Sequence, residues 1–192
     1  NPMCLAKKIK SISHFVSRDA MNIDGMSEAT IEKFIAHGIL HELADIFRLE
    51  NHKDTIVNME GFGEKSYENL VNAANKAKHT TVAKFIYSLG VPNIGLSNAK
   101  MICRSFDNDI ERIRNATAEE LVEIDGVGEV IAESFVSFFN EKAVNDIVDE
   151  LLEIIEFENE EISNEQEDMA GINFVITGSV NHFANRNEVK AL

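Results

Sequence analysis

Hydrophobic residues along this chain fall in short runs that are separated by turn-forming residues. Within a run the apolar positions stand three or four residues apart, which places them on one face of an α-helix. Thr117 and Glu120 form a capping box at the start of one run, and Thr80-Thr81 is suited to cap another. The pattern predicts helices over residues 9–21, 28–37, 41–49, 51–59, 64–78, 82–89, 96–106, 118–124, 129–140 and 145–155.

A glycine-containing signature recurs four times between these predicted helices. It has the form apolar-x-Gly-apolar-Gly, or differs from it at one position, and it occupies residues 23–27, 59–63, 91–95 and 124–128. The first positions of successive copies are separated by 36, 32 and 33 residues. Self-similarity at a nearly fixed period indicates that one supersecondary unit is repeated. We call the four copies hairpins 1 to 4.

The signature combines a tight turn with the start of a helix. Glycine gives the turn access to left-handed backbone angles. The first N–H groups of the following helix have no partner inside the helix and lie at its positive dipole end, where an anion such as phosphate binds well. The central apolar residue is expected to point inward; it is Met26, Phe62, Ile94 or Val127.

Such a unit is typical of the helix-hairpin-helix motif, which binds the nucleic-acid backbone without reading base sequence. A single copy could be only a helix corner, but four copies in register favour phosphate binding. Hairpins 2 and 4 keep both glycines, so we expect them to bind best, whereas Ser27 and Asn93 replace one glycine in hairpins 1 and 3. The predicted DNA-binding residues are Gly25, Ser27, Gly61, Gly63, Lys65, Gly95, Lys100, Gly126 and Gly128.

The charge of the chain weakens a simple DNA-binding interpretation, and its distribution removes most of the objection. The net charge is −15 over 192 residues. Residues 1–142 carry 16 basic and 21 acidic side chains, a net of −5, whereas residues 143–192 carry 2 and 12, a net of −10. Lys33 and Arg104 add cations to the helices after the hairpins. We expect weak binding that depends mainly on backbone N–H groups.

The composition also indicates the cellular compartment. Two cysteines, Cys4 and Cys103, are too few for a disulfide framework and suit a reducing cytoplasm. No apolar run is long enough to span a bilayer, so no membrane partner is expected.

The pattern changes after the predicted hairpin domain, residues 9–142. Residues 143–170 read as a helix followed by an acidic linker, with the linker itself at 157–168. Residues 171–192 contain a predicted strand, 173–177, and the beginning of a helix, 186–192. One strand and part of a helix cannot bury a core, so we expect a truncated α/β tail on a mainly α fold.

Several segments together resemble the bacterial NAD-dependent DNA ligase family; they are residues 14–26, 60–66, 89–91 and 124–128. The order of elements is similar as well. In that family a four-cysteine zinc finger precedes four helix-hairpin-helix motifs, and a BRCT domain follows. The resemblance implies that residues 1–8 are the remnant of the finger, with Cys4 as a zinc ligand, and that residues 171–192 begin a truncated BRCT domain.

The resemblance implies an enzyme that seals nicks in duplex DNA during replication and repair, using NAD, magnesium and zinc. It also implies that this piece is inactive alone, with no cofactor of its own. The family's adenylation motif is Lys-x-Asp-Gly, but Asn22 and Glu123 stand where the lysine should be. Cys4 by itself cannot hold a structural zinc ion. The implied partners are nicked duplex DNA and the N-terminal catalytic domains of the same protein.

Two other functions remain open from the sequence. One is a non-enzymatic helix-hairpin-helix scaffold of DNA repair or recombination. The other is a protein-interaction module in which the acidic residues between 146 and 168 bind a basic partner and the hairpins are only packing corners.

Overall fold

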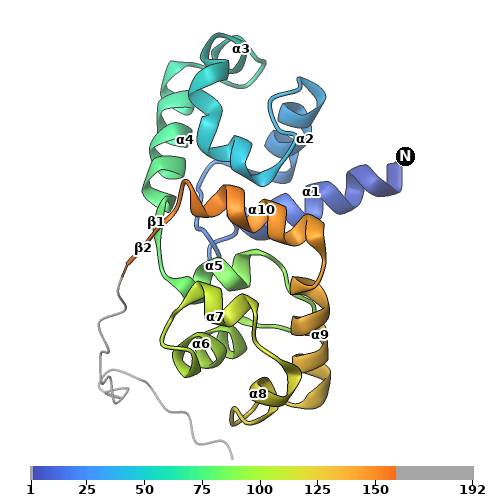
Figure 1. The fold of residues 1–192 in the computed structure, drawn as a ribbon. Helices are drawn as coiled ribbons and strands as arrows, with labels where there is room; N and C mark the ends of the chain where they lie inside the picture. The colour runs from blue at the N-terminus through green and yellow to red at the C-terminus, as the bar shows by residue number, and fades with distance from the viewer. Residues whose placement is uncertain (1, 159–192) are drawn as a thin grey trace, which may run out of the picture. The chain divides into compact units, whose positions relative to one another are not determined.

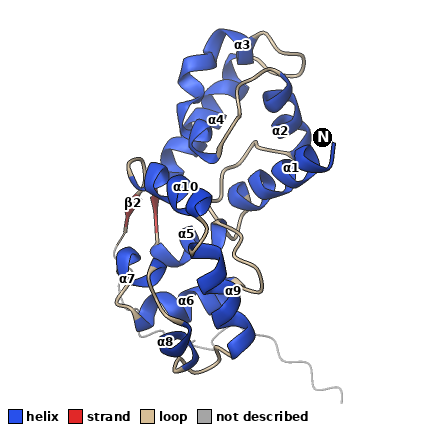
Figure 2. Cartoon of the chain, turned by 45° about the vertical axis from the view of Figure 1, so that its right-hand side comes forward, coloured by secondary structure: helices blue, strands red, loops and turns tan. Residues whose placement is uncertain are grey.

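The computed structural model describes residues 2–158, and this part of the chain is almost entirely helical (Figures 1 and 2). The elements in chain order are α1 (Pro2–Val16), α2 (Glu28–Ala36), the 3₁₀-helix η1 (Leu43–His52), α3 (Lys53–Val57), α4 (Glu64–Ala77), β1 (His79–Thr80), α5 (Val82–Ser88), α6 (Leu96–Ser105), α7 (Ile110–Arg114), α8 (Ala118–Val122), α9 (Glu129–Phe139), α10 (Lys142–Leu152) and β2 (Glu156–Phe157). The prediction of a mainly α fold with tandem hairpins is confirmed.

Most predicted helices form close to their expected bounds, and their caps explain why. The Thr117 side chain accepts a hydrogen bond from the Glu120 N–H at 3.3 Å, and the Glu120 carboxylate accepts one from the Thr117 N–H at 2.9 Å. The Thr81 hydroxyl caps α5 by accepting from the Lys84 N–H at 3.3 Å. These local bonds satisfy N–H groups that the helix leaves unpaired, so both starts are fixed by residues close in sequence.

Four local expectations are corrected by the structure. The first helix ends at Val16 rather than at residue 21, because the Met21 and Asn22 N–H groups bond back to the Phe15 and Ser17 carbonyls in a turn. The segment expected as a helix at 41–49 is the 3₁₀-helix η1. Helix α7 was not predicted, since five residues are too few to show a helical period.

The fourth correction concerns Phe157, which we expected to open the acidic linker. It belongs instead to β2, which pairs in parallel with β1 so that His79 faces Glu156 and Thr80 faces Phe157. The Phe157 ring packs on Phe85 with ring centroids 5.4 Å apart. The packed chain therefore continues through this residue.

One hydrophobic core runs through residues 9–155, and the described residues form one compact unit. Its largest fully buried side chains include Phe15 of α1, Phe34 of α2, Phe85 of α5 and Phe135 of α9. Side chains from the helices of all four hairpins thus share the core with α1. The hairpins are thereby presented on a common, rigidly packed support.

Part of the sequence analysis falls outside the described residues. This applies to the acidic linker from residue 159, the strand at 173–177, the helix start at 186–192 and therefore the whole predicted BRCT segment. Residues 2–8 form the first turns of α1, so the backbone of Cys4 is helical. Within residues 2–158 no helix has both the length and the apolar character needed to cross a membrane.

Candidate nucleic-acid interface

All four hairpins have the same backbone conformation at their first turn position. The φ angles are +90° at Gly25, +86° at Gly61, +63° at Asn93 and +84° at Gly126. This left-handed region is costly for most side chains, and asparagine is one of the few residues besides glycine that visits it regularly. Asn93 therefore preserves the turn geometry of hairpin 3 without a glycine.

The last residue of each hairpin is the N-cap of the next helix. These residues are Ser27 for α2, Gly63 for α4, Gly95 for α6 and Gly128 for α9, all with extended backbone. None of the three glycines has a φ that requires glycine, and a Cβ built at any of them would meet no atom within 4 Å. Nothing inside the described chain explains the missing side chains. Without a side chain, the backbone at these positions is open to close approach by an external group.

The three glycine caps also leave helix N–H groups available. No side chain caps α4, α6 or α9. Hairpin 1 differs, because the Ser27 Oγ accepts a hydrogen bond from the Thr30 N–H at 3.2 Å. Hairpin 1 thus satisfies one of its own donors, whereas hairpins 2, 3 and 4 direct theirs outward.

The central apolar residues anchor the hairpins as expected. Met26, Ile94 and Val127 are buried, with 6%, 8% and 4% of their surface exposed. Phe62 is only partly buried, and its ring packs on Phe34 at a centroid distance of 5.4 Å. Each turn is therefore held by its own side chain against the core.

The hairpins associate in two pairs, 1 with 2 and 3 with 4. In three of the four hairpins, the residue eight positions after the turn residue reaches across to the partner hairpin (33 − 25, 101 − 93 and 134 − 126 all equal 8). The Lys33 ammonium donates to the Glu60 carbonyl at 2.9 Å. The Asn93 amide donates to the Ser134 hydroxyl at 2.8 Å. A Cβ built at Gly126 would lie 3.2 Å from the Met101 methyl group.

A hollow of about 550 Å³ lies between hairpins 1 and 2 and is lined by residues of both turns, among them Gly25, Ser27, Lys33 and Gly61. Lys65 is the second residue of α4 and is exposed. It lies two residues after Gly63, the last residue of hairpin 2. Lys100 is exposed on α6 after hairpin 3. The structure thus places the predicted binding residues on the turns, at helix starts or, for Lys100, in the middle of α6, in two groups that follow the hairpin pairs.

The surroundings of the hairpins differ strongly in charge, which the glycine pattern does not reveal. Between residues 85 and 106, around hairpin 3, the only charged side chains are Lys100 and Arg104. Between residues 117 and 134, around hairpin 4, no basic residue occurs and six acidic residues do: Glu119, Glu120, Glu123, Asp125, Glu129 and Glu133. The residues next to hairpin 3 in sequence are therefore positively charged and those next to hairpin 4 negatively charged, and Arg104 lines one hollow with Glu120, Glu123 and Asp125.

The only pKa shift resolved near hairpin 4 is that of Glu120. The N–H and hydroxyl of Thr117 bond to this carboxylate and lower its pKa. The charged form of Glu120 is therefore favoured by the capping box, which keeps this acid ionised beside hairpin 4.

No group of three or more His, Cys, Asp or Glu side chains suited to a metal ion occurs in the described part of the chain. Cys103 is fully buried in α6 among apolar residues. The described residues therefore do not fit a zinc site, and they offer no cluster for another metal cofactor.

Comparison with known protein families supports the assignment of helix-hairpin-helix motifs to this chain. Residues 17–76 match a family model described as a SAM-like helix-hairpin-helix tandem, and residues 84–148 match one described as a helix-hairpin-helix motif. These two stretches contain hairpins 1 and 2 and hairpins 3 and 4, respectively. Each family model therefore covers one of the two hairpin pairs seen in the structure.

Curated proteins named DNA ligase match nearly the whole chain. The chain is 58% identical over 190 residues to the protein of Lachnoclostridium phytofermentans and 50% identical over 190 residues to that of Ruminiclostridium cellulolyticum. Each match covers 99% of this chain and 29% of the relative, so the chain spans less than a third of their length. By fold the chain is a tandem helix-hairpin-helix unit, and by sequence it corresponds to one segment of the bacterial DNA ligases.

Proposed function

We propose that this unit binds duplex DNA through backbone phosphates, without base selectivity, and holds nicked DNA for sealing by a longer NAD-dependent DNA ligase. The observation that carries the proposal is the set of three N-cap glycines, Gly63, Gly95 and Gly128, whose missing side chains leave open space over helix N–H groups. The names of the relatives and the matched family models support DNA as the ligand.

The hairpins contribute unequally in this proposal. Hairpin 3 combines the intact turn at Asn93 with Lys100 and Arg104, and hairpin 2 has Lys33 and Lys65 within its pair beside the acidic Glu60 and Glu64. Hairpin 4 has both glycines but only acidic neighbours. We therefore assign the main phosphate contacts to hairpins 2 and 3, although the glycine count alone favours 2 and 4.

The unit supplies positioning rather than reaction chemistry. Asn22 and Glu123 precede the two Asp-Gly pairs, so neither provides a nucleophile for AMP. In the proposed enzyme the adenylated lysine, the NAD and magnesium sites and the zinc finger belong to the remainder of the protein, and its location is the cytoplasm. Holding the nick in register contributes through orientation of the reacting groups.

The internal ion pairs argue against the acidic segment as a docking site for a basic partner. Asp146 pairs with Lys142, Asp149 with Arg114, and Glu150 with Arg48. These acids already have intramolecular partners within the described part of the segment. The scaffold alternative shares the same DNA-binding surface, and the relatives named DNA ligase favour the ligase assignment.

The test is fluorescence anisotropy of labelled duplexes at several salt concentrations. We expect binding to two unrelated sequences with equal affinity, and log K falling against log salt with a slope of about −0.9 for each phosphate contacted. A strong base-sequence preference, or binding that salt does not weaken, would overturn the proposal. Adding the catalytic part of a relative to the assay, with NAD, separates a ligase segment from a scaffold.

A further inference from the structure

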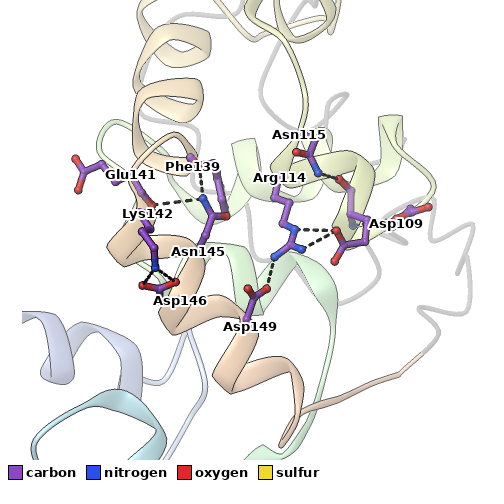
Figure 3. Close-up of polar contacts among 10 residues, drawn as sticks. Asp109, Arg114, Asn115, Phe139, Glu141, Lys142, Asn145, Asp146 and Asp149 are labelled. Atoms are coloured by element: carbon purple, nitrogen blue, oxygen red, sulfur yellow. Dashed lines mark hydrogen bonds and ion pairs between the residues drawn. The ribbon is translucent and has the colours of Figure 1, made fainter.

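Helix α10 is bonded to both hairpin pairs through two consecutive acidic residues. Glu150 pairs with Arg48 of η1, which lies between hairpins 1 and 2 in the chain, at 2.7 Å. Asp149 pairs with Arg114 of α7, which lies between hairpins 3 and 4 (Figure 3). The pKa of each guanidinium is raised chiefly by this hydrogen bond.

The apolar face of α10 is buried in the core as well. Val148 and Leu151 are fully buried, and α10 packs against η1 on one side and α9 on the other. Immediately after α10, β2 pairs with β1, which follows α4. Figure 1 shows α10 between α4 above and α9 below.

A second connection joins the two pairs at α1. The His14 ring is 2.7 Å from the Tyr87 carbonyl of α5, so α1 also contacts the second half of the unit. Both connections add to the shared hydrophobic core in restricting rotation of one pair relative to the other. The ion pairs of α10 are the polar part of the second connection.

We infer that Asp149 and Glu150 are positioning residues for DNA binding, because they hold hairpins 1 and 2 and hairpins 3 and 4 in the arrangement that engages one duplex simultaneously. The inference rests on the proposed function. When two linked sites bind one ligand, the second contact forms at a high effective concentration only while the geometry matches. Loosening α10 lowers that effective concentration without changing either hairpin pair.

The inference predicts an effect opposite to that of simple charge. Removing acidic residues from a DNA-binding protein strengthens binding in general, because phosphate repulsion falls. Neutralising Asp149 and Glu150 should instead weaken binding, since it breaks the bridge. Asp146 and Glu153 provide a matched control, because they lie on or next to α10 and Asp146 pairs only within the helix, with Lys142 (Figure 3).

The experiment compares D149N/E150Q with D146N/E153Q on two DNA ligands. One ligand is a duplex of about 24 base pairs, and the other is a stem-loop of about six base pairs, about 20 Å long. The stem is as long as α4 alone, whose 14 residues span about 21 Å. We expect D149N/E150Q to bind the long duplex about threefold to tenfold more weakly than the wild type and the short stem equally well. The control should bind both as well as the wild type, or more tightly.

Equal affinity of the two double variants for the long duplex would overturn the inference, as would an equal loss on both ligands. If circular dichroism shows that D149N/E150Q does not fold, Glu150→Asp replaces it. This variant keeps the charge but has a shorter side chain, so it should show the same length-dependent loss.

A distance measurement tests the inference without DNA. Spin labels at K76C in α4 and E133C in α9, in a Cys4→Ser background, report the spacing of the two pairs. The distance distribution should broaden in D149N/E150Q and not in D146N/E153Q, and an unchanged distribution would overturn the inference. Failure of the wild type to bind either DNA ligand would contradict the proposed function instead.

Discussion

Hairpins 3 and 4 pack against each other and share one backbone conformation, yet the charged residues that adjoin them in sequence have opposite signs. The φ angles at Asn93 and Gly126 differ by about 20°, and both following helices begin at an uncapped glycine. The charged residues next to the first in sequence are basic and those next to the second are acidic, and in space Arg104 lines one hollow with Glu120, Glu123 and Asp125. A shared turn geometry therefore provides the same donors in both, while the neighbouring charges decide whether a phosphate is held there.

The largest expected effect separates binding from folding. Aspartate is a favourable N-cap, so Gly95→Asp should leave the melting temperature unchanged or raise it. The same carboxylate would occupy the phosphate position, and we expect DNA affinity to fall about thirtyfold, the effect of roughly 2 kcal/mol. Anisotropy and thermal melting measure the two quantities.

Two variants serve as controls for Gly95→Asp. Gly128→Asp makes the same change at hairpin 4 and should reduce affinity less than about twofold, because that site already repels phosphate. Thr81→Asp places a carboxylate at the N-cap of α5, outside the hairpins, and should leave affinity unchanged. Equal losses for Gly95→Asp and Gly128→Asp would show that the charge difference between the hairpins is unimportant.

The next effect tests whether Asn93 is a true replacement for glycine. A β-branched residue is strained at φ +63°, so Asn93→Val should lower the free energy of unfolding by about 2 kcal/mol. Asn93→Gly keeps the turn and loses only the hydrogen bond to Ser134, so it should cost about 1 kcal/mol or less. Chemical denaturation measures both, and equal losses would contradict the role given to the left-handed turn.

A smaller effect concerns the capping box before hairpin 4. Thr117→Ala should destabilise the protein by about 1 kcal/mol and leave DNA affinity unchanged. In the folded protein the pKa of Glu120 lies below its ordinary value, so its contribution to stability is complete above the ordinary pKa and is lost as the pH falls through the lowered one. The stability difference between the wild type and the variant should therefore shrink in acid, as denaturation at several pH values would show.

The smallest expected effects come from single surface charges. Lys100→Gln should weaken binding about threefold and reduce the magnitude of the salt slope by about 1 if the ammonium contacts one phosphate. Glu129→Gln combined with Glu133→Gln should strengthen binding by about twofold, since repulsion at hairpin 4 falls. An unchanged salt slope in the lysine variant would remove Lys100 from the interface.

The helices and turns could be predicted because their causes are local. Apolar spacing defined the helical faces, and the capping groups of Thr81 and Thr117 lie within three residues of the N–H groups they accept from. The four hairpins were visible because each needs only five adjacent residues. The exceptions, α7, β1 and β2, are too short to display a period.

The sequence by itself determined the repeated unit, its turn residues and the inward direction of its central apolar side chains. Only the tertiary structure decided which hairpins pair, that Asn93 bonds to Ser134 41 residues away, and that Phe157 packs beside Phe85 rather than opening a linker. It also decided that one helix contacts both halves through Asp149 and Glu150. These outcomes depend on contacts between residues far apart in the chain, whose pairing follows from packing of the whole core and not from any local preference.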